Sequence, residues 1–234
     1  MRSTLLVEIQ QKGRGLQKNM GVTYYSDNKK AAKKADIIWL CINPSQSKEV
    51  LKELEPIVES QTIISIMISI SQEYLKKFFP NSPVIRYMPT SLIKEGRGVT
   101  FLAEDSEYET KRITKELREW SSHLHVVEDE DMNFYTTLAC GHIYTVVSFM
   151  SAISVIGKDF EKDIAVDIAL EALSSIKDKN LGQIKKLRES TTTSAGIVES
   201  GLEELSSQQV KEVYSNAVKK TMEKLEKLQK KCED

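Results

Sequence analysis

The chain of 234 residues has few cysteines, no excess charge of either sign and no long uninterrupted hydrophobic run. Its three cysteines, Cys41, Cys140 and Cys232, are odd in number and form no C-x-x-C pair, which argues against a disulfide framework or a metal site and for a reducing compartment. Lys and Arg number 33 against 34 Asp and Glu, so the charge gives no support for a nucleic-acid partner. The apolar stretches are too short to span a membrane or to form a signal peptide. We therefore expect a cytoplasmic protein without nucleic-acid, membrane or metal partners.

The first part of the chain, up to about residue 127, alternates short β-branched runs with charged amphipathic stretches. This alternation predicts an α/β domain with a mainly parallel sheet. The expected strands are residues 5–9, 22–25, 36–42, 62–66, 84–87, 99–102 and 125–127. The expected helices are residues 16–19, 28–35, 46–59, 72–79 and 107–121.

The remainder of the chain has helical periodicity throughout, which predicts a second, all-helical domain over residues 128–234 after a first domain over residues 1–127. Residues 132–157 are apolar around the whole helix circumference, as in a helix buried on several sides or at a subunit contact. Residues 210–228 form an amphipathic helix with one apolar face. Periodicity alone leaves open whether this face packs on its own domain or on another subunit.

Four motifs occur in a specific order along the chain, and the best defined is Arg86-Tyr87-Met88-Pro89 at the end of an apolar segment that we expect to be a strand. The others are ADIIWLCINP at residues 35–44, EGRGVT at residues 95–100 and TSAGIVESGL at residues 193–202. In order and spacing they resemble the pyrroline-5-carboxylate reductases over nearly the whole chain. The resemblance implies a Rossmann-like domain followed by a helical dimerisation domain, NADP or NAD as cofactor, a small cyclic imine as substrate, and a homodimer or higher homo-oligomer.

The candidate cofactor site follows from the predicted sheet, because ligands of doubly wound sheets bind beyond the carboxyl ends of the strands. The residues expected to face this crevice and hold the nicotinamide are Asn43, Pro44, Met67, Met88, Pro89 and Thr90. The resemblance places the substrate at Thr191, Thr192, Thr193, Ser194 and Gly196. Hydride transfer depends on positioning more than on strong acids or bases, so the absence of a Ser-His-Asp arrangement is no objection.

The front of the chain departs from the family, because it has no Gly-x-Gly-x-x-Gly phosphate loop; Gly13-Arg14-Gly15 begins that pattern and fails at its third glycine. We interpret residues 5–9 as the second strand of the fold, with the first strand, the loop and the first helix missing. Either Met1 is an internal methionine of a longer reading frame, or the chain is a shortened relative that closes its sheet differently. In this register Lys12 or Arg14 could approach a ribose 2′-phosphate. The alternative is that each is a solvated charge in a loop, and this alternative is the commoner case.

The substrate end departs as well, since Cys140-Gly141-His142-Ile143 replaces the family's Gly-Ser-Gly-Pro, and the family's assisting hydroxyl falls on Val198. We interpret His142 and Cys140 as core residues rather than as an acid, base or nucleophile. Arg86 either binds an anion or, as we favour, hydrogen-bonds local carbonyls of its turn. Two functions therefore compete. The first is a reductase of a small cyclic imine, and the second is a catalytically impaired homologue that acts as a dimeric binding or regulatory protein.

Overall fold

The structure is a computed structural model, and it describes most of the α/β part of the chain and several of the later helices. The described residues are 3–6, 23–90, 93, 98–104, 107–139, 170–171, 173–174, 177–191 and 197–233.

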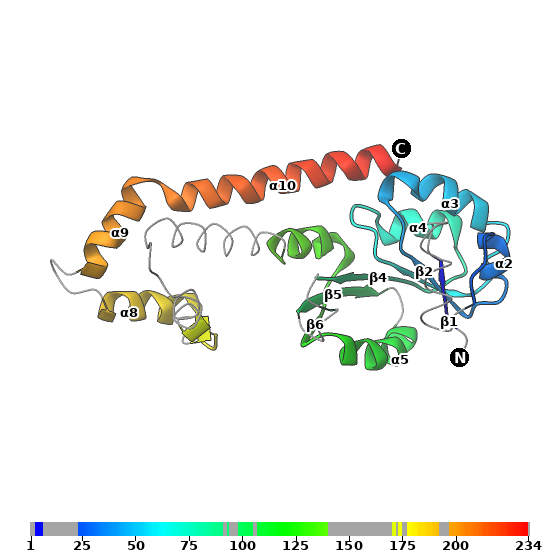
Figure 1. The fold of residues 1–234 in the computed structure, drawn as a ribbon, viewed down its shortest axis with the longest axis horizontal. Helices are drawn as coiled ribbons and strands as arrows, with labels where there is room; N and C mark the ends of the chain where they lie inside the picture. The colour runs from blue at the N-terminus through cyan, green and yellow to red at the C-terminus, as the bar shows by residue number, and fades with distance from the viewer. Residues whose placement is uncertain are drawn as a thin grey trace. The chain divides into compact units, whose positions relative to one another are not determined.

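Six strands form one sheet in the described part of the chain, and their order in the sheet is their order in the sequence (Figure 1). They are β1 (Ser3–Leu6), β2 (Ile37–Leu40), β3 (Thr62–Ser65), β4 (Val84–Pro89), β5 (Val99–Glu104) and β6 (His123–Val126). All neighbouring pairs are parallel except β4 with β5. The predicted mainly parallel α/β fold is confirmed.

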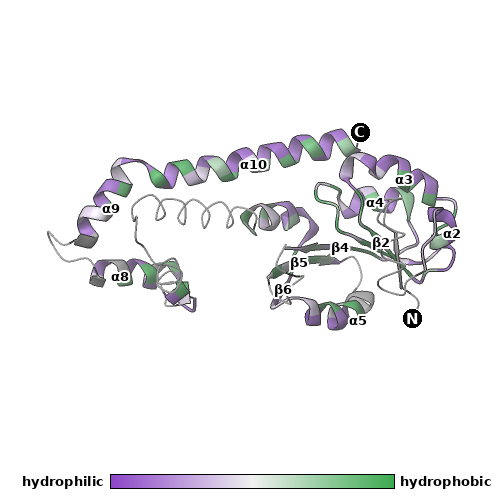
Figure 2. Cartoon of the chain, viewed as in Figure 1, coloured by the Kyte–Doolittle hydropathy of each residue, from purple (hydrophilic) through white to green (hydrophobic). Residues whose placement is uncertain are grey.

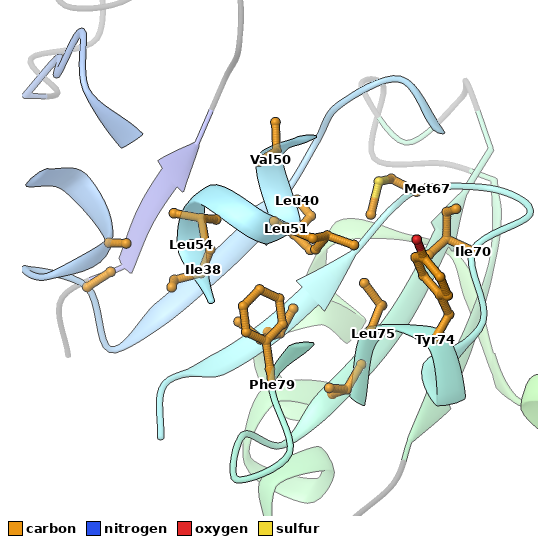
Figure 3. Packing of buried hydrophobic residues seen from close by; sticks show 14 of the residues in the cluster. Ile38, Leu40, Val50, Leu51, Leu54, Met67, Ile70, Tyr74, Leu75 and Phe79 are labelled. Carbon is orange, nitrogen blue, oxygen red and sulfur yellow. The ribbon is translucent and has the colours of Figure 1, made fainter. Parts of the chain in front are cut away.

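The helices lie on both faces of the sheet. Successive parallel strands that advance in one direction, joined by right-handed crossovers, place their helices on a common face. Accordingly, α2 (Asn28–Ala32), α3 (Ser47–Leu54) and α4 (Gln72–Phe78) share one core cluster with β2 and β3 (Figure 3). The helix α5 (Glu107–Leu117), with the 3-10 turn η3 (Arg118–Trp120) after it, contributes to a separate cluster on the other face.

Strand β2 illustrates why the sheet buries both faces, because side chains alternate along a strand. Ile38 and Leu40 join the cluster with α2 to α4, whereas Ile37 and Trp39 join the cluster that includes Ile113 of α5. A strand covered on both sides must be apolar at every position, which is the pattern of its sequence, IIWL.

Polar residues that precede the helices set where they begin. The Asp27 carboxylate caps α2 by accepting hydrogen bonds from the backbone N of Lys29 and Lys30, at 2.9 and 3.2 Å. The Ser71 hydroxyl caps α4 by accepting from the Tyr74 backbone N at 3.1 Å. Such caps satisfy amides that the first helical turn leaves without partners.

The strand predicted over residues 22–25 is wrong, because residues 23–25 are irregular. In place of strand pairing, this segment contacts the core through a side chain: Tyr25 packs against the core cluster that includes α2 to α4. The Lys34 ammonium lies 5.2 Å from the centre of the Tyr25 ring. The strand expected over residues 125–127 begins earlier, at His123 of β6. The helix predicted over residues 16–19 lies outside the described residues.

Strand β1 pairs directly with β2 in parallel register, Ser3 opposite Ile37 and Leu6 opposite Leu40. Residues 3–6 of this chain therefore fill the position beside β2, at the end of the described strand order. Because that order never reverses, the six described strands contain no topological switch point, where doubly wound sheets usually bind a nucleotide. Residues 7–9, the rest of the predicted strand, lie outside the described residues.

The later part of the chain is helical, as predicted, with α8 (Leu181–Thr191), α9 (Ile197–Ser207) and α10 (Val210–Glu233), a helix of mixed hydropathy (Figure 2). A helix also covers residues 132–139; the rest of the helix expected over 132–157 lies outside the described residues. Two compact units divide the chain. One comprises residues 1–140 with 220–234, and the other comprises residues 141–219.

This division differs from the predicted boundary near residue 127. The difference arises because residues 132–139 and the last turns of α10 pack on the sheet unit. Leu225 and Cys232 of α10 are buried, and Cys232 joins the cluster formed by α2 to α4. Part of the apolar face expected over residues 210–228 is therefore covered within the chain.

Within the described residues, no helix combines the length and the apolarity needed to cross a membrane.

Candidate functional site

The carboxyl ends of β2, β3 and β4 lie side by side, which brings three of the predicted turns together. Leu40 at the end of β2 pairs with Ser65 at the end of β3, and Ser65 pairs with Arg86 in β4. Beyond Arg86, β4 continues to Pro89 with only β5 as its partner. The turns that start at Cys41 and Ile66 therefore meet the projecting end of β4, and they form the candidate site.

Asn43 and Pro44 form the turn after β2. The exposed Asn43 side chain accepts hydrogen bonds through Oδ1 from Ser45, at 3.0 Å from the backbone N and 2.9 Å from Oγ. It thereby caps the 3-10 turn η1 (Pro44–Gln46), whose first position suits proline. The oxygen of this predicted cofactor-binding residue is thus engaged in local structure, while Nδ2 is a further donor on the same amide.

The turn over residues 66–71 follows β3 and is held in an unusual conformation. Met67 is buried, and its side chain lies in the core cluster with α3 and α4 (Figure 3). Its backbone N donates to Ser65 Oγ at 3.2 Å. Ser69 has φ 69°, in the left-handed region that non-glycine residues seldom adopt. Since the Met67 side chain is directed into the core, its backbone is the part that this turn offers to a ligand.

The end of β4 holds the other three predicted cofactor residues. Met88 is buried against Phe101 of β5, and Pro89 is half-buried. Thr90 is tied to Val99 in both directions: its backbone N donates to Val99 O at 3.1 Å, and its Oγ1 accepts from Val99 N at 3.2 Å. The Met88 to Thr90 segment is therefore rigidly positioned beside the 66–71 turn.

Arg86 binds neither a local carbonyl nor an exposed anion site, so both sequence interpretations of it were wrong. The side chain is buried, and its Nη1 donates to Asp129 Oδ1 at 2.7 Å while Nη2 donates to Asn133 Oδ1 at 3.2 Å. Asp129 belongs to the 3-10 turn η4 (Asp129–Asp131), 43 residues along the chain. No local pattern around Arg86 indicated this carboxylate.

Burial raises the pKa of the Cys41 thiol, at the start of the first turn, to about 11. The thiol therefore stays protonated near neutral pH and is not poised as a nucleophile. Among the described side chains, no group of three or more His, Cys, Asp or Glu is placed to hold a metal ion.

The predicted substrate residues belong to the unit formed by residues 141–219. Thr191 is the last residue of α8, and Val198 is the second residue of α9. The other predicted positions lie outside the described residues: Thr192, Thr193, Ser194, Gly196, Cys140, His142, Lys12, and Gly13-Arg14-Gly15.

Comparison with known proteins links this arrangement to one group of enzymes. The model of the family described as NADP oxidoreductase coenzyme F420-dependent matches residues 7–69. The pyrroline-5-carboxylate reductase of Aquifex aeolicus is 27% identical, over 93% of this chain and 84% of that protein. Pyrroline-5-carboxylate reductase 2 of Bacillus subtilis is 25% identical, over 80% and 70% of the two chains.

Solved structures show the same fold. The NADP-bound pyrroline carboxylate reductase of Plasmodium falciparum has a TM-score of 0.78 at 19% identity, covering 90% of this chain and 84% of that one. The 1-pyrroline-5-carboxylate reductase of Streptococcus pyogenes has a TM-score of 0.79 at 19% identity, covering 94% and 87%.

The sheet, its helices and the clustered strand ends define a Rossmann-like α/β fold, and the relatives that align with this chain are reductases. The chain is similar to pyrroline-5-carboxylate reductases along nearly its whole length.

Proposed function

We propose that this protein is an NAD(P)H-dependent reductase of a small cyclic imine of the pyrroline-5-carboxylate type, acting in proline biosynthesis. The observation that carries the proposal is the meeting of the three turns after β2, β3 and β4, in a chain that aligns with a reductase of that name over 93% of its length. The turns place backbone groups and small polar side chains at one edge of a rigid sheet. A nicotinamide cofactor supplies the hydride, so the protein has to bind and orient the reactants.

In this proposal the nicotinamide lies against Asn43 and Pro44, the backbone at Met67, and the segment Met88 to Thr90. The substrate is held by Thr191 to Ser194 and Gly196. The cofactor assignment is supported by the geometry of the strand ends, and the substrate assignment is supported by the position of the motif at residues 193–202. The protein works in the cytoplasm, where thiols such as Cys41 and Cys232 stay reduced.

A homodimer is the second part of the proposal. Five large apolar side chains are exposed on the described helices of the 141–219 unit. Exposed apolar side chains gathered on one unit are typical of a protein–protein contact surface. They are Leu170, Leu173, Leu181, Leu205 and Val213, with exposures of 49–85%. A second copy of the chain is the partner that would cover them.

The test is titration with NADPH and with NADH, followed by nicotinamide fluorescence, together with a reductase assay on pyrroline-5-carboxylate. We expect micromolar binding of at least one cofactor, on the order of −8 kcal/mol, and measurable turnover. The two titrations also decide between NADP and NAD.

The competing function, a catalytically impaired dimeric binding or regulatory protein, is favoured by Val198, which occupies the position of the family's assisting hydroxyl. Binding of cofactor without turnover, and no gain of turnover in Val198→Thr, would favour that alternative. No binding at millimolar cofactor would overturn the reductase proposal.

A further inference from the structure

Seven polar residues form a series of hydrogen bonds in the unit that contains the sheet, and the peptide bond between Ser71 and Gln72 closes this series into a ring. They come from four segments that are separate in sequence: the start of α4, β4, the continuous stretch of η4 and the helix over residues 132–139, and the last turns of α10. The members are Ser71, Gln72, Arg86, Asp129, Asn133, Gln229 and Glu233.

The ring closes on the first turn of α4 through two carboxylates. Glu233 Oε1 accepts from Ser71 twice, at 2.8 Å from the backbone N and 2.7 Å from Oγ, across 162 residues of sequence. Asp129 Oδ2 accepts from the next amide, the Gln72 backbone N, at 2.9 Å. Because Ser71 Oγ–H points to Glu233, the oxygen lone pairs are free to cap the Tyr74 amide. Carboxylates are favoured at this end of a helix, where unpaired amides carry partial positive charge.

The other side of the ring connects the same two carboxylates through neutral amides and a buried cation. Gln229 Nε2 lies 3.4 Å from both Glu233 oxygens, and its Oε1 accepts from Asn133 Nδ2 at 3.1 Å. Asn133 Oδ1 in turn accepts from Arg86, which is paired with Asp129. Each member therefore fixes the rotamer of the next, and such networks are stronger than their separate bonds.

The ring holds the turn of the candidate site that is least stable by itself. Ser71 is two residues after Ser69, whose left-handed backbone persists only where the surroundings enforce it. The same turn carries the Met67 backbone, which the proposed function places against the nicotinamide. The backbone N and the hydroxyl of Ser71 both donate to Glu233, and these two hydrogen bonds provide that enforcement. The helix that carries Glu233 is itself anchored by buried Leu225 and Cys232.

We propose that the last turn of α10 is a clasp in which Glu233 holds the 66–71 turn in its cofactor-binding conformation. Glu233 is then a positioning residue: it acts through Ser71 and contacts neither cofactor nor substrate. The inference rests on the proposed function for its link to the cofactor, but the clasp itself is a property of the turn.

Three variants of the full chain separate the clasp from general effects. Glu233→Ala removes the acceptor for Ser71, whereas Glu233→Gln keeps an amide oxygen in the same place. Glu226→Ala is the matched control, because Glu226 is an exposed glutamate two turns earlier on the same helix. Hydrogen exchange of the peptide containing residues 69–74 is the first measurement. We expect exchange about tenfold faster in Glu233→Ala, and close to wild type in the other two, because a lost charged hydrogen bond exposes these amides.

The second measurement is the dissociation constant for NADPH and NADH. Glu233→Ala should weaken binding about tenfold, with Glu233→Gln restoring it, since the acceptor geometry and not the bulk of the side chain is what matters. Unchanged exchange in Glu233→Ala would overturn the clasp. Faster exchange with an unchanged dissociation constant would overturn the positioning role. If wild-type protein bound neither cofactor, the proposed function and the positioning role would both fail, while the exchange data would still decide whether the clasp exists.

Discussion

Arg86 is the residue whose role depends most on partners distant in the sequence. Its guanidinium is almost fully buried, with 2% of the side chain exposed, and Asp129 supplies the opposing charge from η4. Burying a charge is costly unless it is paired and hydrogen-bonded, so the pair has to be made for the α/β unit to fold. The residue that best marks the family in the sequence is therefore a structural residue in this chain.

Removing the charge of Asp129 should destabilise the protein by about 3 kcal/mol, because Asp129→Asn leaves the buried guanidinium without a counter-charge. The double variant Arg86→Met/Asp129→Asn should lose less than the sum of the two single changes, since it removes both charges. Urea unfolding followed by tryptophan fluorescence measures this directly, because both tryptophans lie in the same unit as the pair. Asp131→Asn, at an exposed neighbouring position, is the control. Additive losses would contradict the buried-pair interpretation.

Cys41 should be a slow nucleophile, because burial raises the pKa of its thiol from 9.0 to about 11. At pH 8 its alkylation by iodoacetamide should be about a hundredfold slower than that of an ordinary thiol, in proportion to the thiolate fraction. Mass spectrometry of the peptide with and without urea provides the comparison. The raised pKa also means that the folded state retains the proton, so this contribution to stability is complete below pH 9 and is lost as pH rises towards 11. Equal labelling rates in folded and unfolded protein would refute this.

At the scale of the elements, the inner face of α3 is fully buried, although this helix ends at Leu54 and not at residue 59 as predicted. Leu51→Ala should cost about 2–5 kcal/mol, because its side chain is inaccessible and contacts the cluster shared by α2, α4 and the sheet. Val126→Ala, at a half-exposed position of β6, should cost less than about 1 kcal/mol. Both values come from denaturant unfolding. Similar losses for the two variants would show that α3 does not pack as described.

The strands illustrate what periodicity can and cannot predict. Residues 37–40 are a continuous apolar run, whereas residues 62–65 and 84–87 are mainly apolar and include Thr62, Ser65 and Arg86; all three lie in strands covered on both faces. Residues 23–25 have a similar content and are irregular, because Tyr25 reaches the core by its side chain alone. A short apolar run predicts that some of its side chains are buried, and side chains can be buried without the backbone forming a strand.

For the whole molecule, the proposed homodimer predicts a particle of twice the mass of one chain in light scattering. Leu181→Glu/Leu205→Glu should shift it to the monomer mass, because two desolvated charges cannot be accommodated in an apolar interface. Val126→Glu, which places the same charge at an exposed site in the other unit, should leave the mass unchanged. A wild-type monomer at micromolar concentration would contradict the proposal.

The candidate site was only partly predictable. The strand ends predicted at residues 42, 66 and 87 lie within two residues of the observed ends at Leu40, Ser65 and Pro89, so three segments of the site were expected together. That the Met67 side chain would be turned into the core, and that Ser69 would be left-handed, had no signal in the residue types. Both depend on how α4 docks on the sheet, which local sequence does not encode.

The sequence by itself determined most of the described elements, the mainly parallel sheet and the resemblance to a reductase family, because these depend on local periodicity and on motifs within short windows. Only the tertiary structure decided that β1 lies directly beside β2, that Arg86 is paired with Asp129, and that Glu233 accepts hydrogen bonds from Ser71, the N-cap of α4. The physical reason is that hydrogen-bond and charge partners are chosen by proximity in the folded chain. The two residues of a pair separated by 162 positions carry no mark of each other until the helices and the sheet have packed.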